Sequence, residues 1–244
     1  MLIAVFFVTS VISVATGATS LITVPVMIQL GIEPHLAVAT NMMALIFMSI
    51  GCSLPFAQKG VVSRARLPGM IILTIFGSAL GAFSLLLISQ RTVQLVIVTA
   101  MIGVVVFTLM RHDIGETSTS VSRAREIGGY GATFLLGIYG GFFSGGYITL
   151  LTAAFVLFFG MTLLQAVATT KVANVFSSTV AVLIFAWRGT INYRLGAILG
   201  ITMFIGAMIG GYATMKISSA WLRRIFIAVV LGLALKMLGN IVRI

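Results

Sequence analysis

The chain has 244 residues, of which 60% are hydrophobic and only 8% are charged, and its formal net charge is +11. A soluble domain carries about 25% charged residues, so this composition excludes a soluble protein and indicates an integral membrane protein. The apolar runs are long rather than alternating, which favours an all-α protein over an outer-membrane barrel. Lys and Arg lie mainly between the apolar runs, as positive-inside topology requires, so the charge predicts no nucleic-acid partner.

The first apolar segment covers residues 1–30 and is interrupted by Thr16-Gly17-Ala18-Thr19-Ser20. One continuous helix of this length would measure about 45 Å, against a hydrocarbon core of about 30 Å. We therefore predict two half-helices that meet at the break. The segment 127–160 has an equivalent break from Gly140 to Gly146. Irregular backbone at membrane depth is tolerated where it is buried in protein or lines a cavity.

Six full spans are predicted, at 36–57, 68–89, 92–110, 164–187, 195–216 and 220–242. The polar stretch 111–126 is interpreted as a linker between a first membrane repeat, 1–110, and a second, 127–244. The second and fifth spans carry G-x-x-x-G, at Gly77 and Gly81 and at Gly206 and Gly210. These close-packing faces serve contacts within or between chains, so the sequence leaves a homodimer open.

A short motif occurs twice, as Ala37-Val38-Ala39-Thr40-Asn41 and as Ala166-Val167-Ala168-Thr169-Thr170-Lys171. The copies are 129 positions apart, from Ala37 to Ala166, and the same offset aligns Gly17 with Gly146 and Gly31 with Gly160. This gap-free match indicates an internal duplication, which is typical of transporters.

Two topologies fit the duplication. If each broken segment is a re-entrant hairpin, each half has three full spans and the halves are inverted repeats. The basic gaps 57–67, 111–126 and 216–224 then face the cytoplasm. If the broken segments cross fully, the chain has eight spans and parallel halves. The positive-inside count does not decide between them, and we favour the hairpins on segment length.

Lys171 is the sharpest candidate for a functional residue, because a cation inside an apolar span usually faces a cavity or a partner. The alternative is a lysine that snorkels to the headgroups. Beside half-helix N-termini, such a cation makes an anion site. Interhelical hydrogen bonding and tight packing are the alternatives for its polar neighbours. The predicted substrate-binding residues are Ser20, Thr40, Asn41, Ser144, Gly145, Gly146, Thr169, Thr170, Lys171 and Asn174.

An enzyme is not expected. Gly141-Phe142-Phe143-Ser144-Gly145 faintly resembles an intramembrane serine protease motif, but that chemistry needs a base near the serine. His35 and His112 lie outside the predicted spans. A single cysteine, Cys52, gives no metal cluster, and no cofactor is expected.

The doubled pattern resembles the TauE/SafE-type sulfite exporter family. Each half of that family carries a Gly-rich break, a segment such as Val24-Pro25-Val26, and then Gly–x5–Ala-x-Ala-Thr. Here the last element starts at Gly31 and again at Gly160. The resemblance covers nearly the whole chain. One departure is Gly17-Ala18-Thr19-Ser20, which replaces the family's usual glycine cluster, so substrate choice could differ.

The resemblance implies a secondary transporter and exporter of a small anion, such as sulfite, an organosulfonate or a related sulfur anion. It would work by alternating access between the repeats of a multi-pass protein of the cell (inner) membrane. The sequence leaves open whether a coupling ion, a proton or sodium, takes part. An anion channel, or a thiosulfate-type pore or partner subunit of a sulfur-metabolising system, is the alternative.

Overall fold

The computed structural model describes residues 1–58, 66–110, 120–214 and 230–239. Their regular structure is helical throughout. The helices are α1 (Leu2–Thr16), α2 (Ser20–Gln29), α3 (Pro34–Gln58), α4 (Leu67–Leu87), α5 (Gln90–Met110), α6 (Arg123–Phe142), α7 (Tyr147–Phe159), α8 (Leu163–Trp187) and α9 (Tyr193–Thr214), followed by a shorter helix, Val230–Gly239.

The predicted all-α membrane architecture is confirmed. Five helices, α3, α4, α5, α8 and α9, are long and apolar enough to cross a membrane. Their ends lie within a few residues of the predicted spans. The sixth predicted span, 220–242, lies largely outside the described residues, although 230–239 is helical. The last four residues of the predicted linker, 123–126, form the first turn of α6.

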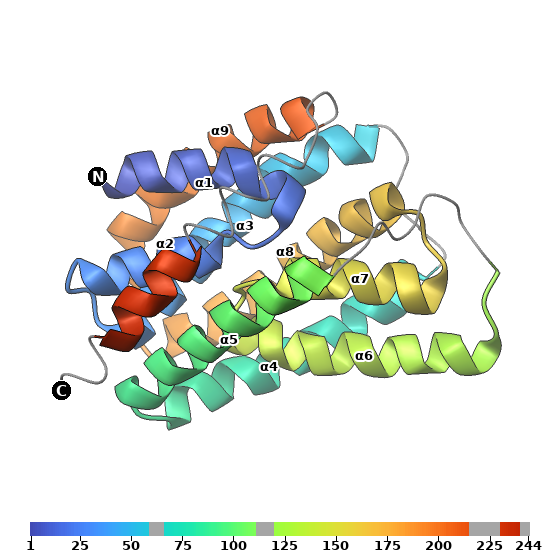
Figure 1. Ribbon diagram of the computed structural model, residues 1–244, viewed down its shortest axis with the longest axis horizontal. Helices are drawn as coiled ribbons and strands as arrows, with labels where there is room; N and C mark the ends of the chain where they lie inside the picture. Colours follow the sequence, from blue (N-terminus) through green and yellow to red (C-terminus); the bar gives the residue numbers. More distant parts are fainter. Residues whose placement is uncertain (59–65, 111–119, 215–229, 240–244) are drawn as a thin grey trace.

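Both predicted breaks are present, and each separates two helices that fold back on one another (Figure 1). Gly17 has φ +72° and Gly146 has φ +78°. Side chains with a Cβ rarely adopt this left-handed conformation, so glycine is what allows the chain to reverse here. The fold-back agrees with the predicted hairpins, while their re-entry into a membrane and the inverted orientation of the halves stay predictions.

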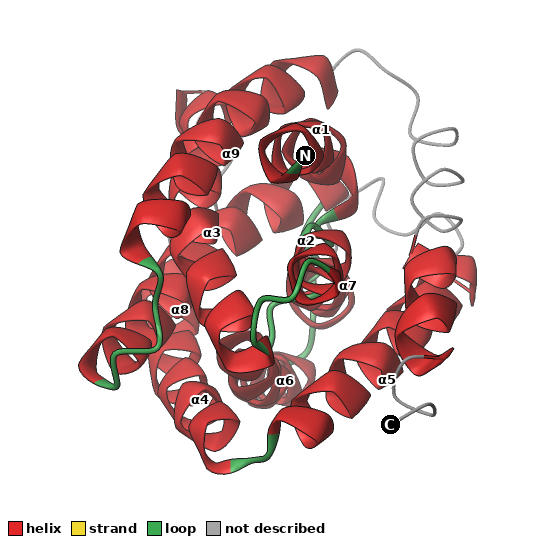
Figure 2. Ribbon diagram, turned by 90° about the vertical axis from the view of Figure 1, so that its left-hand side faces the viewer, coloured by secondary structure: helices red, strands yellow, loops and turns green. Residues whose placement is uncertain are grey.

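The short helices α2 and α7 lie in the interior, surrounded by the longer ones (Figure 2). The longer helices pack across the two halves of the sequence. Helix α4 packs against α6 and α8, whereas α9 packs against α1 and α3. Helices α3 and α8 also pack against each other. The two halves are therefore interleaved rather than separate.

Glycines set the closest of these contacts. A Cβ on Gly81 would lie 1.9 Å from the carbonyl oxygen of Ile138, and one on Gly141 would lie 2.1 Å from that of Ser78. Helices α4 and α6 thus touch backbone to backbone. On α9, a Cβ on Gly206 would lie 2.0 Å from Ser10 Oγ of α1. Both predicted G-x-x-x-G faces therefore serve packing within the chain.

Helix α3 begins at a charged cap. The Glu33 carboxylate accepts from the backbone N–H groups of His35, at 3.2 Å, and Leu36, at 2.9 Å. Burial alone raises the pKa of this carboxyl, but hydrogen bonds from His35 and from these backbone groups bring the pKa below its ordinary value. Helix α8 begins instead at a neutral capping box formed by Thr162 and Gln165.

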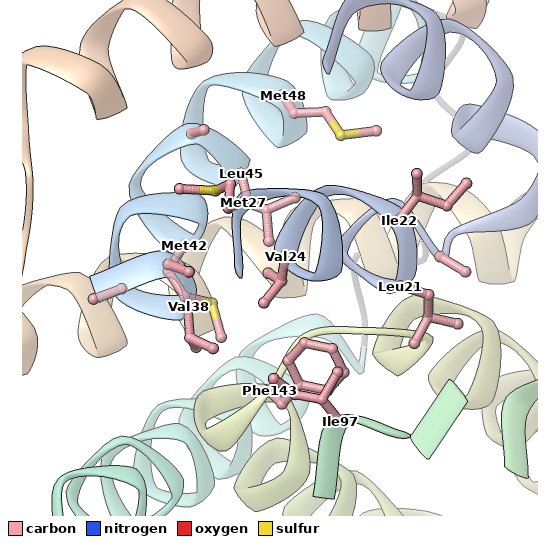
Figure 3. Close-up of a cluster of buried hydrophobic side chains, with 14 of the residues drawn as sticks. Leu21, Ile22, Val24, Met27, Val38, Met42, Leu45, Met48, Ile97 and Phe143 are labelled. Atoms are coloured by element: carbon pink, nitrogen blue, oxygen red, sulfur yellow. The ribbon is translucent and has the colours of Figure 1, made fainter. Parts of the chain in front are cut away.

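The offset of 129 positions reappears in the helices. Helices α3 and α8 each have 25 residues, and they begin at Pro34 and Leu163, respectively. Gly31 and Gly160 both have positive φ. In the first half, α2 packs on α3 through an apolar core that includes Leu21, Val24, Met27, Met42, Leu45 and Met48 (Figure 3).

Candidate functional site

Three of the predicted substrate-binding residues, Ser20, Asn41 and Ser144, lie together where the two breaks meet. Ser20 Oγ, at the start of α2, and Ser144 Oγ, in the second break, are 2.7 Å apart. Asn41 Nδ2 donates to Ser20 Oγ at 2.8 Å, and Thr23 Oγ1 donates to Asn41 Oδ1 at 2.7 Å. All four side chains are buried. Their polar atoms bond to one another, which joins the two halves at the breaks.

The two glycines of the second break are held by close packing. A Cβ on Gly145 would lie 2.3 Å from the ring of Phe143 and 2.6 Å from Leu21 of α2. A Cβ on Gly146 would lie 2.3 Å from Val104 of α5. The breaks therefore lack room for larger side chains.

Thr40, Thr169 and Thr170 point to different partners. Thr40 Oγ1 accepts from the Asn192 backbone N–H at 3.1 Å, which ties the α8–α9 connection to α3. Thr169 donates to the Gln165 carbonyl of its own helix at 2.7 Å. Thr170 lies 3.2 Å from Thr152 of α7. Thr152 and Thr170 correspond by offset to Thr23 and Asn41, so both halves join matched helices with a matched bond.

Lys171 and Asn174 differ from these residues, because each has a buried polar atom without a hydrogen-bond partner in the described chain. Lys171 is 1% exposed, and its ammonium has no hydrogen-bond partner among the residues that the structure describes. Asn174 donates to Ser49 Oγ of α3 at 2.6 Å. Its Oδ1, and the Ser178 hydroxyl one turn further along α8, have no partner in the described chain.

The predicted internal duplication allows these polar residues to be compared with the residues at the matched positions. The offset matches Lys171 with Met42 and Asn174 with Leu45, and both apolar partners are buried in the first-half core. The same helix position is therefore filled adequately by an apolar side chain. Packing alone therefore does not account for a buried lysine and amide at these positions.

Sequence reasoning did not find a second polar group, which consists of Thr74 and Ser78 of α4, Tyr147 of α7 and Ser177 of α8. These side chains are buried. Ser78 Oγ and Ser177 Oγ are 2.6 Å apart. The offset could have found them, because Ser177 corresponds to Met48 and Ser78 to Ala207.

Other kinds of site find no support in the described geometry. Ser144 bonds to Ser20, whereas His35 bonds to Glu33 and to the Ile88 carbonyl, so the described contacts hold no serine–histidine pair. Within the described residues, no three His, Cys, Asp or Glu side chains gather as metal ligands. An apolar cleft of about 310 Å³ lies elsewhere, lined by Leu95, Val96, Thr99, Ala100 and Tyr139.

The fold and this site define a multi-pass helical membrane protein with interleaved halves, in which a lysine buried at their contact has no ion-pair partner within the described part of the chain. Residues 2–237 match the family described as Sulfite exporter TauE/SafE. The chain belongs to this family, which is a family of membrane transporters rather than enzymes, and the predicted resemblance is confirmed.

Curated relatives carry consistent names. The chain is 24% identical over 234 residues to "Probable membrane transporter protein ORF9" of Sinorhizobium sp, covering 96% of this chain and 90% of that protein. It is 26% identical to a "Probable membrane transporter protein" of Haemophilus influenzae, covering 88% and 84%. It is also 26% identical to "Probable membrane transporter protein YfcA" of Escherichia coli, covering 91% and 82%. No solved structure matches the chain.

Proposed function

We propose that this protein is a secondary transporter that exports a small sulfur oxyanion, such as sulfite or an organosulfonate. The anion binds at Lys171, between α3 and α8, and the two halves rock around it to give alternating access. One observation carries the proposal: a fully buried ammonium that has no hydrogen-bond partner among the described residues.

Charge neutralisation favours an anion from outside the chain. A buried, unpaired charge is expensive and normally acquires a counter-ion. The two ion pairs among the described residues are His35–Glu33 and Arg66–Glu126, and neither includes Lys171. The remaining acids, Asp113 and Glu116, lie outside the described residues. A small anion that enters the site would supply the missing charge.

The neighbouring polar atoms suit an oxyanion. The Ser178 hydroxyl is a free donor for an anion oxygen, and it lies two turns from Lys171 on the same face of α8. Asn174 Oδ1 is a free acceptor, which can hold the ammonium in place or accept from a protonated oxyanion. Together with the ammonium, these two groups replace only part of the hydration shell of the anion. Binding of the anion therefore stays weak enough for its release.

The family description supports sulfite as the first substrate to test and export as the direction. Ser20, Asn41 and Ser144 are assigned to the contact between the hairpins, where they bond to one another. They would adjust as the halves move. Thr40 holds the α8–α9 connection and is not assigned to the anion.

Counterflow of radiolabelled sulfite in proteoliposomes tests the proposal, with sulfite, sulfoacetate, thiosulfate, sulfate and chloride as trans anions. The variant is Lys171→Met, which installs the side chain found at the matched position 42. The control is Lys236→Met, which removes an equal charge from an exposed lysine.

We expect sulfur anions to exchange through wild type and Lys236→Met, and Lys171→Met to lose exchange while remaining folded. Unchanged exchange in Lys171→Met would refute the site. Flux without counterflow would favour a channel, and no flux from any anion would favour a partner subunit.

A further inference from the structure

A titratable pair, Glu33 and His35, lies at the start of α3 and contacts the end of α4. His35 Nδ1 is 2.7 Å from a carboxylate oxygen of Glu33, and Nε2 is 3.1 Å from the carbonyl oxygen of Ile88, the C-cap residue of α4. The His35 side chain is 16% exposed and the Glu33 side chain is 38% exposed. The fold therefore covers most of the pair but leaves it within reach of water.

The two contacts of the ring require two protons. A carbonyl oxygen only accepts, so Nε2 must carry a proton to bond to Ile88. The contact between Nδ1 and the Glu33 carboxyl needs a second proton, held by one group or the other. A neutral imidazole has one N–H, and an ionised carboxylate has none. The geometry is therefore that of a pair that has taken up one additional proton.

The hydrogen bonds of Glu33 place this proton on the ring. Burial raises the pKa of the Glu33 carboxyl, but the bonds from His35 and from two backbone N–H groups outweigh burial and bring that pKa below its ordinary value. The carboxylate thus stays ionised, and the ring is an imidazolium.

Loss of the additional proton breaks one particular contact. The carboxylate is the stronger acceptor because it is charged, so the remaining N–H stays on Nδ1. Nε2 then turns a lone pair toward the Ile88 carbonyl, and two acceptors repel each other. Raising the pH therefore releases the tie between α3 and α4, whereas lowering the pH restores it.

Other charges nearby do not replace the proton. Within the described chain, α2 carries no charged side chain. The charged residues at this end of α5, α8 and α9 are all exposed, and neither ion pair of the described residues joins one of them to Glu33 or His35. These residues are Arg91, Arg188 and Arg194.

A helix start at this place does not need a titratable pair. The offset matches Glu33 with Thr162 and His35 with Leu164. Helix α8 begins there with the neutral capping box of Thr162 and Gln165. Capping alone therefore does not account for the histidine, whose ring reaches a second helix.

The tie crosses between two groups of helices. Helix α3 packs with α9, which packs with α1, whereas α4 packs with α6 and α8. The bond from His35 to Ile88 joins the first group to the second. Lys171 lies where the same groups meet, at the contact of α3 with α8. A bond between the groups restrains their relative movement around that site.

We propose that the Glu33–His35 pair is a proton-binding site that controls this movement. The proton adds to the lone pair of Nε2, the ring becomes an imidazolium, and the two helix groups are joined through Ile88. Proton binding stands independently of the anion site. Regulation of anion movement by the proton, in contrast, rests on the proposed function.

The first test is a pH titration of the purified full-length protein with isotope-labelled histidine, followed by nitrogen nuclear magnetic resonance. The variant His112→Gln leaves His35 as the one histidine of the chain. We expect a protonated ring on the acid side. On the alkaline side the neutral ring should keep its proton on Nδ1, because the carboxylate holds it there.

Glu33→Gln, made in the same protein, removes the charge but keeps an oxygen that can cap α3. It should weaken proton binding by His35 about tenfold and move the proton of the neutral ring to Nε2. Glu126→Gln is the matched control, since this carboxylate pairs with Arg66 instead, and its titration should be unchanged. A neutral ring protonated at Nε2 before Glu33 is replaced, or equal titrations in both variants, would overturn the proton site.

The second test is counterflow of sulfoacetate, whose charge is constant near neutral pH, on the acid and alkaline sides of the measured titration. We expect the His112→Gln protein to exchange about fivefold or more faster on the alkaline side, where the tie is released. His35→Gln should show a ratio of about one between the same two conditions. Equal ratios in the two proteins would overturn the regulation. Absence of exchange from both would refute the proposed function, while the titration would still decide the proton site.

Discussion

At the scale of single residues, matched positions in the two halves carry different amounts of hydrogen bonding. Thr23 supplies a proton to Asn41 Oδ1, at 2.7 Å. Its counterpart Thr152 contacts Thr170, which also donates to the Val167 carbonyl at 2.9 Å. Loss of the first threonine hydroxyl would strand an amide oxygen, whereas loss of the second leaves its partner bonded.

We therefore predict that Thr23→Val lowers the free energy of unfolding by about 1–3 kcal/mol, the usual effect of a stranded buried polar group. Thr152→Val should cost less than about 1 kcal/mol. Unfolding in a denaturing detergent, followed by circular dichroism, measures both. Equal losses would show that the two bonds are equivalent and that the Asn41 network has no special role.

The sequence identified Lys171 and Asn174 because a charge and an amide inside an apolar span are conspicuous. It grouped Thr40 with Asn41, although adjacent helix residues point about 100° apart, and the structure turns Thr40 toward Asn192. Tyr147 and Thr74 escaped notice, since a tyrosine or threonine in an apolar run gives no signal until its neighbours on other helices are known.

At the scale of elements, the contact between α4 and α6 depends on glycines, which have no side chain to keep the two backbones apart. A methyl group on Gly81 would meet the Ile138 carbonyl at 1.9 Å. The obstacle is backbone, which a change of rotamer cannot relieve. Gly103 on α5 has no heavy atom within 4 Å of such a position, so the same substitution there meets open space.

Gly81→Ala should therefore destabilise the protein by more than about 2 kcal/mol through overpacking. Gly103→Ala should be neutral or stabilising by up to about 1 kcal/mol, because alanine is the better helix former. The same unfolding measurement compares them. A mild effect of Gly81→Ala would mean that α4 and α6 separate readily.

Helix positions were predicted to within a few residues, because hydropathy marks the spans and the Gly-rich stretches mark the breaks. Partner choice was not predicted. The period of small residues shows which face of α4 packs closely, but Gly137 and Gly141 become its partners only through the path of the whole chain. Hydropathy contains no information on that path.

At the scale of the whole molecule, the halves complete each other. Helix α4 finds its main partners, α6 and α8, in the second half, and α9 finds α1 and α3 in the first. The positive-inside count did not distinguish hairpins from full crossings, because both place the basic gaps unevenly. Segment length is what favours the fold-back of α1 on α2 and of α6 on α7.

Interleaving predicts the behaviour of a divided chain. Residues 1–110 and 111–244, expressed together as separate polypeptides, should copurify and exchange anions. Each fragment expressed alone should be degraded or aggregate, since it exposes a small-residue face without its partner. Affinity purification through a tag on one fragment measures this. A fragment that is monodisperse on its own, at full-length yield, would contradict the interleaved packing.

The contact between α4 and α6 also has a consequence for synthesis. The ribosome completes α4 at Leu87, but Tyr130, the first residue of α6 that lies beside an α4 glycine, is made about 40 residues later, and α8 later still. At elongation rates of about 5–20 residues per second, α4 waits for seconds in the membrane with its glycine face uncovered. During that interval the nascent chain depends on lipid, or on the insertion machinery, to shield a surface that the finished protein hides completely.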